Sequence, residues 1–237
     1  ITRILRFPHR SRIVFCPHGW SVDMIGARRI RGMAAAVERM LAKLPDRVIV
    51  ISHHEYNRAL EIGVRSDRLS LIPNGISRET PAVEPAQWDD DRIKVLYAGR
   101  FDYQKGVDIL LEAIKGLEDR INVRLVGDVA VDGKMPKMQI PSGVTWLGWL
   151  DRDDVIAQMK SCDVLVVPSR WEGFGLVVVE AMRLSKPVVA TAVGGLQEIL
   201  GKGRFGYLVP PENPKALHDL LRNLNRDDLE RVEIGRA

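Results

Sequence analysis

The stretch VLVVPSRWEGFGLVVVEAM, residues 164–182, indicates the fold class of this chain. Four apolar residues end at Pro168 and are followed by a glycine-bearing loop and then by a helical pattern. A run that is apolar on both faces is typical of a strand in a parallel sheet that helices cover on both sides. The stretch therefore predicts a strand, a loop and a helix in an α/β protein.

The same order of strand and helix recurs along the chain. Apolar, β-branched runs predict further strands at 13–16, 48–51, 69–72, 93–97, 123–126, 144–147, 188–190 and 207–209. Apolar residues recur at helical spacing over 30–44 and 107–117. Ser52 and Asp151 are placed to cap helices. We expect a complete doubly wound domain on the last six strands, after part of a second α/β domain.

The stretch Arg78–Asp91 breaks this order, because it holds two prolines and an acidic run without an apolar period. We expect a linker there and a domain junction near Asn74–Ile76, so that the domains are residues 1–75 and 76–237. The chain opens without Met, and we expect it to be a piece of a longer protein.

Composition narrows the class of protein. The chain has 237 residues, of which 46% are apolar and 28% charged, as in ordinary globular proteins. No stretch approaches the ~18–20 consecutive apolar residues of a membrane span. Cys16 and Cys162 make no disulfide framework and favour a reducing compartment, so we expect a cytoplasmic protein. The five histidines have no metal-ligand spacing with Cys or acidic residues, and we expect no metal site.

The net charge of +4 is unevenly distributed along the chain. Residues 1–50 carry ten Lys and Arg against three Asp and Glu. A solvated basic helix face explains this excess, and contact with the inner face of a membrane is the alternative. We expect no nucleic-acid partner, because the arginines are not interleaved with aromatic residues and no recognition module is present.

Two cations follow the strand predicted at 93–97. Gly99 lets the backbone turn closely, and Arg100 and Lys105 come before a helix expected to begin near Gly106. Cations at a helix N-terminus add to the positive end of its dipole, which suits a phosphate or diphosphate. Two solvated loop cations are the structural alternative.

Two carboxylates flank the loop after the strand at 164–167. Glu172 precedes the expected helix and Glu180 lies within it. Carboxylates that face one cleft suit sugar hydroxyls, and the N–H groups of Phe174–Leu176 are placed to face an anion. An acid near a helix N-terminus and an exposed helix position are the structural alternatives. His18 also follows a predicted strand, where a structural role is the alternative to a catalytic one.

Five motifs together resemble the retaining glycosyltransferases of family four, which have the GT-B fold. Their order and spacing agree from about Ile13 to Leu224: IPNGI at 72–76, GR and KG within 99–106, EGFG at 172–175 with Glu180, VATAVGG at 189–195 and GYLVP at 206–210. The resemblance implies two Rossmann-like domains that face a cleft. It also implies that the C-terminal domain holds most of a nucleotide-sugar donor.

The resemblance further implies roles for single residues. Arg100 and Lys105 would bind the diphosphate, Glu172 would contact the transferred sugar, and His18 would reach that sugar from the first domain; these four are the expected catalytic residues. Glu180 would accept from the ribose hydroxyls, and residues 147–150 would flank the base. The implied donor-binding set is Gly99, Arg100, Lys105, Leu147, Trp149, Leu150, Glu172, Gly173, Phe174, Gly175, Leu176 and Glu180.

The implied activity is transfer of a hexose from a UDP- or GDP-linked donor to an acceptor hydroxyl, with retention and without metal or other cofactor. The acceptor would be a glycan, a lipid-linked or a small molecule, as in polysaccharide biosynthesis. A glycogen-synthase-like or sugar-phosphate synthase relative and a non-catalytic nucleotide-sugar binding module stay open. The family's first glycine-rich loop is absent, and Val129 stands where a glycine is usual. Against the family's pattern, the chain also lacks the start of the N-terminal domain and the closing C-terminal helix. Because much of the acceptor site would then be missing, we expect this piece alone to be inactive.

Overall fold

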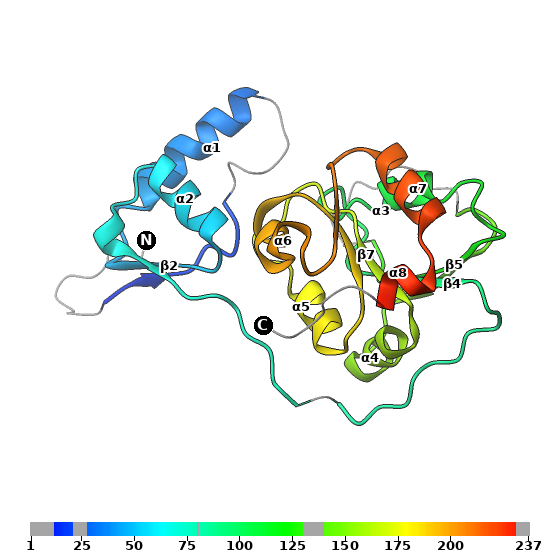
Figure 1. Ribbon diagram of the computed structural model, residues 1–237. Helices are drawn as coiled ribbons and strands as arrows, with labels where there is room; N and C mark the ends of the chain where they lie inside the picture. The colour runs from blue at the N-terminus through cyan, green and yellow to red at the C-terminus, as the bar shows by residue number, and fades with distance from the viewer. Residues whose placement is uncertain (1–11, 21–27, 80, 130–139, 231–237) are drawn as a thin grey trace.

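The computed structural model describes residues 12–20, 28–79, 81–129 and 140–230, which form two parallel sheets (Figure 1). The first sheet has the order β1-β2-β3, and all its pairs are parallel. Its strands and the helices beside them are β1 (Val14–Phe15), α1 (Arg28–Leu41), β2 (Arg47–Val50), α2 (His53–Glu61), a short 3-10 helix (Ser66–Arg68) and β3 (Leu69–Leu71).

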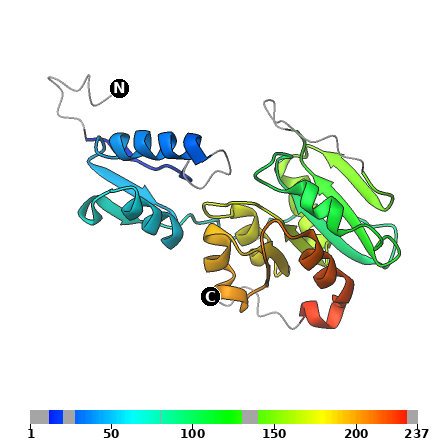
Figure 2. The same cartoon turned by 90° about the horizontal axis from the view of Figure 1, so that it is seen from above.

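The second sheet has six parallel strands in the order β6-β5-β4-β7-β8-β9. Figure 2 shows both sheet units from above, the first in blue to cyan and the second in green to red. Its elements are β4 (Ile93–Ala98), α3 (Val107–Ala113), β5 (Ile121–Val126), β6 (Val144–Gly148), α4 (Arg152–Ser161), β7 (Val164–Val167), α5 (Leu176–Arg183), β8 (Val188–Thr191), α6 (Gly194–Ile199), a 3-10 helix (Gly201–Gly203), β9 (Tyr207–Val209), α7 (Pro214–Asn223) and α8 (Arg226–Glu230). The sheet confirms the six-stranded α/β domain predicted from the sequence.

The chain reverses its direction across the sheet between β6 and β7. It proceeds outward from β4 through β5 to β6 and then returns to place β7 on the other side of β4. Val95 pairs with Val164 and Leu96 with Leu165 at this junction. The loops after β4 and β7 therefore leave the same sheet edge at the point where strand order reverses, which is where open α/β sheets bind ligands.

Helices cover both faces of the second sheet, as apolar strands require. Helices α3 and α7 bury residues such as Leu110 and Leu217 on one face. Helices α4, α5 and α6 bury Met159, Val178 and Leu196 on the other. Both predicted caps are confirmed: Ser52 accepts from the N–H of Glu55, and Asp151 accepts from the N–H of Asp154.

Two helical patterns differ from the structure in detail. Helix α3 ends at Ala113, and the apolar period beyond it continues through a turn in which Ile114 and Leu117 are buried. On α1, Met33 is 72% exposed and Met40 62% exposed, and Val37 is also exposed. The spacing predicted a helix correctly there, but a period alone does not show whether an apolar face has a partner.

The predicted linker is fixed to α4. In its described parts, 72–79 and 81–92, the segment between β3 and β4 has no helix or strand. The ammonium of Lys160 donates to the carbonyls of Pro81 and Val83, at 2.6 and 2.8 Å. The indole of Trp88 donates to Ser161 at 2.9 Å. The domain boundary at 75 and 76 falls within this segment and stays a prediction.

The two sheet units meet where α2 faces α6. The carboxylate of Glu198 on α6 accepts from the backbone N–H of His53 at 2.8 Å and of His54 at 2.5 Å. These N–H groups belong to the first turn of α2 and have no acceptor within their own helix.

Among the residues that the structure describes, no helix combines the length and the apolar character needed to cross a membrane.

Asp90 before β4 gives the second sheet a testable pH dependence. Its carboxylate accepts from Arg92 at 2.6 Å and Asn122 at 2.8 Å, and the hydrogen bond from Arg92 is the main cause that holds the pKa of Asp90 well below its usual range. A depressed pKa contributes stability above the unfolded value of about 3.9, and this contribution is lost as the pH falls below it.

We expect Asp90→Asn to lower the free energy of unfolding at pH 7 by up to about 1 kcal/mol. The difference from wild type should shrink as the pH falls below about 4, measured by urea unfolding at a series of pH values. Asp91→Asn is the matched control, since Asp91 accepts from Arg226 through its backbone carbonyl. A difference that stays constant with pH would contradict this account.

Candidate functional site

A cavity of about 380 Å³ lies at the carboxyl ends of β4 and β7. The loop after β4 supplies Gly99, Arg100 and Lys105 to its wall, and the segment after β7 supplies Glu172 and the residues that begin α5. The first sheet unit contributes His18, Ile51 and Asn74. The cavity therefore draws on both units of the chain.

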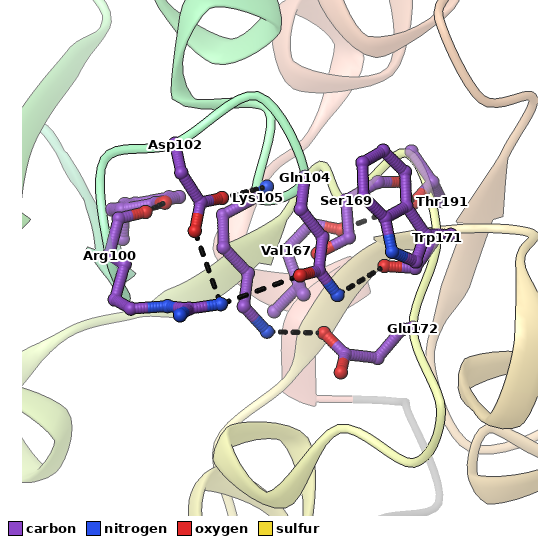
Figure 3. A network of polar contacts seen from close by, with 10 residues as sticks. Arg100, Asp102, Gln104, Lys105, Val167, Ser169, Trp171, Glu172 and Thr191 are labelled. Atoms are coloured by element: carbon purple, nitrogen blue, oxygen red, sulfur yellow. Dashed lines mark hydrogen bonds and ion pairs between the residues drawn. The ribbon is translucent and has the colours of Figure 1, made fainter. Parts of the chain in front are cut away.

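The loop after β4 is fixed by its own hydrogen bonds (Figure 3). The buried hydroxyl of Tyr97 donates to the carbonyl of Arg100 at 2.8 Å. The carboxylate of Asp102 accepts from the backbone N–H of Lys105 at 2.9 Å and lies 3.2 Å from Nη2 of Arg100. These contacts hold both cations on the side of the loop that faces the cavity.

The loop after β4 and the loop after β7 approach each other closely at Gly106. Gly106 has φ +65 and caps α3, and a Cβ there would lie 2.2 Å from the carbonyl oxygen of Pro168. A second close approach fixes Glu172, because a Cβ on Gly194 would lie 1.8 Å from its carbonyl oxygen. These two positions require glycine, and they place the loops against each other and against α6.

An ion pair between the two loops lies at the centre of the site. Nζ of Lys105 is 2.5 Å from Oε2 of Glu172, and their side chains are only 23% and 11% exposed (Figure 3). A partly buried ammonium interacts more strongly with anions than one in water does. A phosphate oxygen is an acceptor of the same kind as this carboxylate, so a diphosphate can compete for Lys105.

The start of α5 completes the polar side of the cavity. Phe174, Gly175 and Leu176 line it, and Gly175 has φ +99 at the N-cap of the helix. The first N–H groups of a helix lack intrahelical acceptors and carry the positive end of the dipole. Trp149 adds a large aromatic surface, 61% exposed, on the same cavity. The arrangement can hold an anion beside a flat apolar group.

The structure brings together most of the residues singled out from the sequence. Those that line the cavity are His18, Gly99, Arg100, Lys105, Trp149, Glu172, Phe174, Gly175 and Leu176. Leu147 and Leu150 instead pack against the core between β7, α4 and α5. A Cβ on Gly173 would lie 2.8 Å from Oε1 of Glu55. Glu180 is half-buried on α5, where burial raises its pKa. The binding roles of all these residues stay predictions.

Several cavity residues were missed. Ile51 follows β2, and the rule that ligands bind at the carboxyl ends of strands could have found it. Tyr97 and Ser169 lie at the ends of β4 and β7 but carry no signal of their own in the sequence.

In the described part of the chain, no group of three His, Cys, Asp or Glu is placed to hold a metal ion. A metal-independent site stays a prediction.

Two families of known proteins match this chain, one over each sheet unit. Residues 80–237 match the family of glycosyl transferases group 1, and residues 2–80 match glycosyltransferase family 4. An uncharacterised 41.2 kDa protein in the cps region of Klebsiella pneumoniae is 31% identical over 90% of this chain and 61% of its own length. An uncharacterised glycosyltransferase of Methanocaldococcus jannaschii is 37% identical over 79% of this chain and 52% of its own length.

A solved structure has the same fold. Anabaena HepE, crystallised with UDP and glucose, superposes with a TM-score of 0.76 and 24% identity over 93% of this chain and 63% of its own. The expected α/β fold of the GT-B type is confirmed. The chain spans just over half to three-fifths of the curated relatives described here. The match to glycosyl transferases group 1, over residues 80–237, covers more than half of this chain. The chain therefore belongs to the family of group 1 glycosyl transferases.

Proposed function

We propose that this chain holds the nucleoside diphosphate of a sugar donor and that the whole protein transfers the sugar to an acceptor hydroxyl with retention of configuration. One observation carries the proposal: Lys105 and Glu172 meet at 2.5 Å in a cavity at the carboxyl ends of β4 and β7. The start of α5 and the exposed face of Trp149 line the same cavity. Diphosphate, sugar and base each find a suitable surface.

Each charged side chain has a role in this reaction. Lys105 and Arg100 bind the diphosphate and stabilise the negative charge that develops on it as the bond to the sugar breaks. Glu172 accepts hydrogen bonds from the sugar hydroxyls. His18 reaches the sugar from the first sheet unit. It lines the cavity, and its own φ of +53 lies in the left-handed region.

Retention follows when the acceptor oxygen attacks C1 of the sugar on the same face from which the leaving phosphate departs. The bond from C1 of the sugar to the phosphate oxygen breaks, and the bond from C1 to the acceptor oxygen forms on the same face. The acceptor proton moves to the departing phosphate oxygen. This route needs no covalent bond from Glu172 to the sugar, which agrees with the role of Glu172 as an acceptor of hydrogen bonds from the sugar hydroxyls.

The remaining parts of the proposal concern the partners. The donor is UDP- or GDP-linked, no metal or other cofactor takes part, and the acceptor is a glycan, a lipid-linked or a small molecule. Cys16 and Cys162 are both free thiols, which supports a cytoplasmic location. The exposed Met33 and Met40 on α1 favour contact with the inner membrane face as a second property of the protein.

We expect one nucleotide among UDP, GDP and ADP to raise the midpoint of thermal unfolding. At ~100 times Kd, binding adds about 2.7 kcal/mol, which shifts the midpoint by roughly 5–10 °C in a chain of this size. Lys105→Ala should abolish most of the shift. Lys115→Ala is the matched control, because Lys115 follows α3, is exposed and pairs with Glu112 of that helix.

Two outcomes would contradict the proposal: no nucleotide shifts the midpoint, or Lys105→Ala responds as wild type does. Incubation of the full-length protein with UDP-glucose or GDP-mannose then separates the alternatives. A transferase releases free nucleoside diphosphate when an acceptor is supplied, whereas a non-catalytic binding module releases none.

The half-buried Glu180 supplies a second test. If its carboxylate accepts from the ribose hydroxyls, wild type should bind the ribonucleotide that it prefers about tenfold more tightly than the 2′-deoxy form. Because burial raises the pKa of Glu180, this preference should grow as the pH rises through that pKa. Glu180→Gln should lose most of the preference and its pH dependence in calorimetric titrations. An unchanged preference would remove Glu180 from the ribose site.

A further inference from the structure

Arg170, two residues before Glu172, has no role in the proposed transfer, yet it is the most extensively bonded cation near the cavity. Its side chain is 8% exposed. Nη1 and Nη2 donate to the two carboxylate oxygens of Asp108 at 2.9 and 2.6 Å. Nη1 also donates to the carbonyl of Tyr103 at 2.8 Å, and Nε lies 3.3 Å from Glu212. The guanidinium stacks 3.9 Å from the centre of the Tyr103 ring.

Two of these partners, Tyr103 and Asp108, belong to the loop that carries Lys105 and to the helix that follows it. Tyr103 precedes Lys105 by two residues, and Asp108 lies in the first turn of α3. The backbone adds two contacts between the same loops: the N–H of Arg170 donates to the carbonyl of Gln104 at 2.8 Å, and the amide of Gln104 donates to the carbonyl of Trp171 at 3.2 Å. Figure 3 shows the second of these beside the ion pair.

The geometry is specific to arginine. A guanidinium is a planar fork that donates to both oxygens of a carboxylate and can stack on an aromatic ring at the same time. A lysine ammonium keeps the charge but has neither the fork nor the flat face. The contacts of Arg170 therefore fix the direction of the loop as well as neutralise a buried charge.

We propose that Arg170 is a positioning residue that sets where the carboxylate of Glu172 lies relative to Lys105, and so determines how strongly the site prefers a sugar-linked diphosphate to a free one. The inference rests on the proposed function. Arg170 does not line the cavity and acts through Glu172. Binding of a free diphosphate depends chiefly on Arg100, Lys105 and the start of α5, whereas binding of the sugar linked to it depends on Glu172.

The test compares the affinities of UDP and UDP-glucose, or of GDP and GDP-mannose, whichever pair wild type binds. Arg170→Lys should lower the affinity for the sugar-linked form about tenfold and that for the free diphosphate less than about threefold. Asp108→Asn, which removes the partner of the fork, should change the same ratio in the same direction. This second variant keeps the test decisive if Arg170→Lys fails to fold.

A double-variant cycle identifies the route. In the Glu172→Gln background the ratio of the two affinities should already be reduced, and adding Arg170→Lys should lower it no further. Arg124→Lys is the matched control. Arg124 also stacks on an aromatic ring, 4.2 Å from the centre of Trp88, and bonds to Gln158 at 3.0 Å, but away from the cavity. It should leave the ratio at its wild-type value.

The inference is overturned if Arg170→Lys and Asp108→Asn keep the wild-type ratio, or if their effect adds fully to that of Glu172→Gln. A wild-type chain that binds neither the free nor the sugar-linked diphosphate overturns the proposed function, and this inference with it. The two failures are distinguishable, because the second is seen with wild type alone before any variant is made.

Discussion

The parallel pairing of β4 with β7 is the constraint on which the site depends. These strands are separated in sequence by α3, β5, β6 and α4, yet they are neighbours in the sheet. Their loops leave one edge together, and glycine at 106 lets the loop after β4 approach the carbonyl of Pro168. A larger residue there would need a backbone shift. The sheet order and this one contact bring a cation and a carboxylate from distant segments into one cavity.

In the proposed reaction, the ion pair of Lys105 with Glu172 connects donor binding with sugar transfer. Both side chains are mostly removed from water, so each charge needs its partner. A diphosphate that displaces Glu172 from the ammonium leaves the carboxylate free to meet the sugar that follows it. One exchange of partners would thus prepare the two ends of the donor in turn. The fixed loops around the pair keep this exchange local.

The strands were predictable because valine-rich runs that are apolar on both faces have few other structures available. The six predicted strands of the second sheet agree with β4–β9 to within two residues at each end. Lys105 and Glu172 could be singled out from strand-end position and residue type. Their direct contact could not, because it depends on the order of strands, which no local pattern encodes.

Other features lie wholly outside local patterns. The sequence does not distinguish Arg170 from other loop cations, and only the tertiary approach of Asp108 and Tyr103 shows that its side chain is buried. The same holds for Gly194, whose need for glycine arises from the carbonyl of Glu172. On α1 the reverse occurs, since the apolar period predicts a helix but not the exposure of Met33.

Hydrogen exchange with and without the preferred nucleotide tests most directly whether both loops hold one ligand. The account predicts that saturating nucleotide slows amide exchange in residues 99–106 and in residues 169–178 together, with the same dependence on nucleotide concentration. Helix α7, which lies on the other face of the sheet, should exchange as before. Protection of only one loop, or of neither, would contradict a donor site built from the ends of β4 and β7.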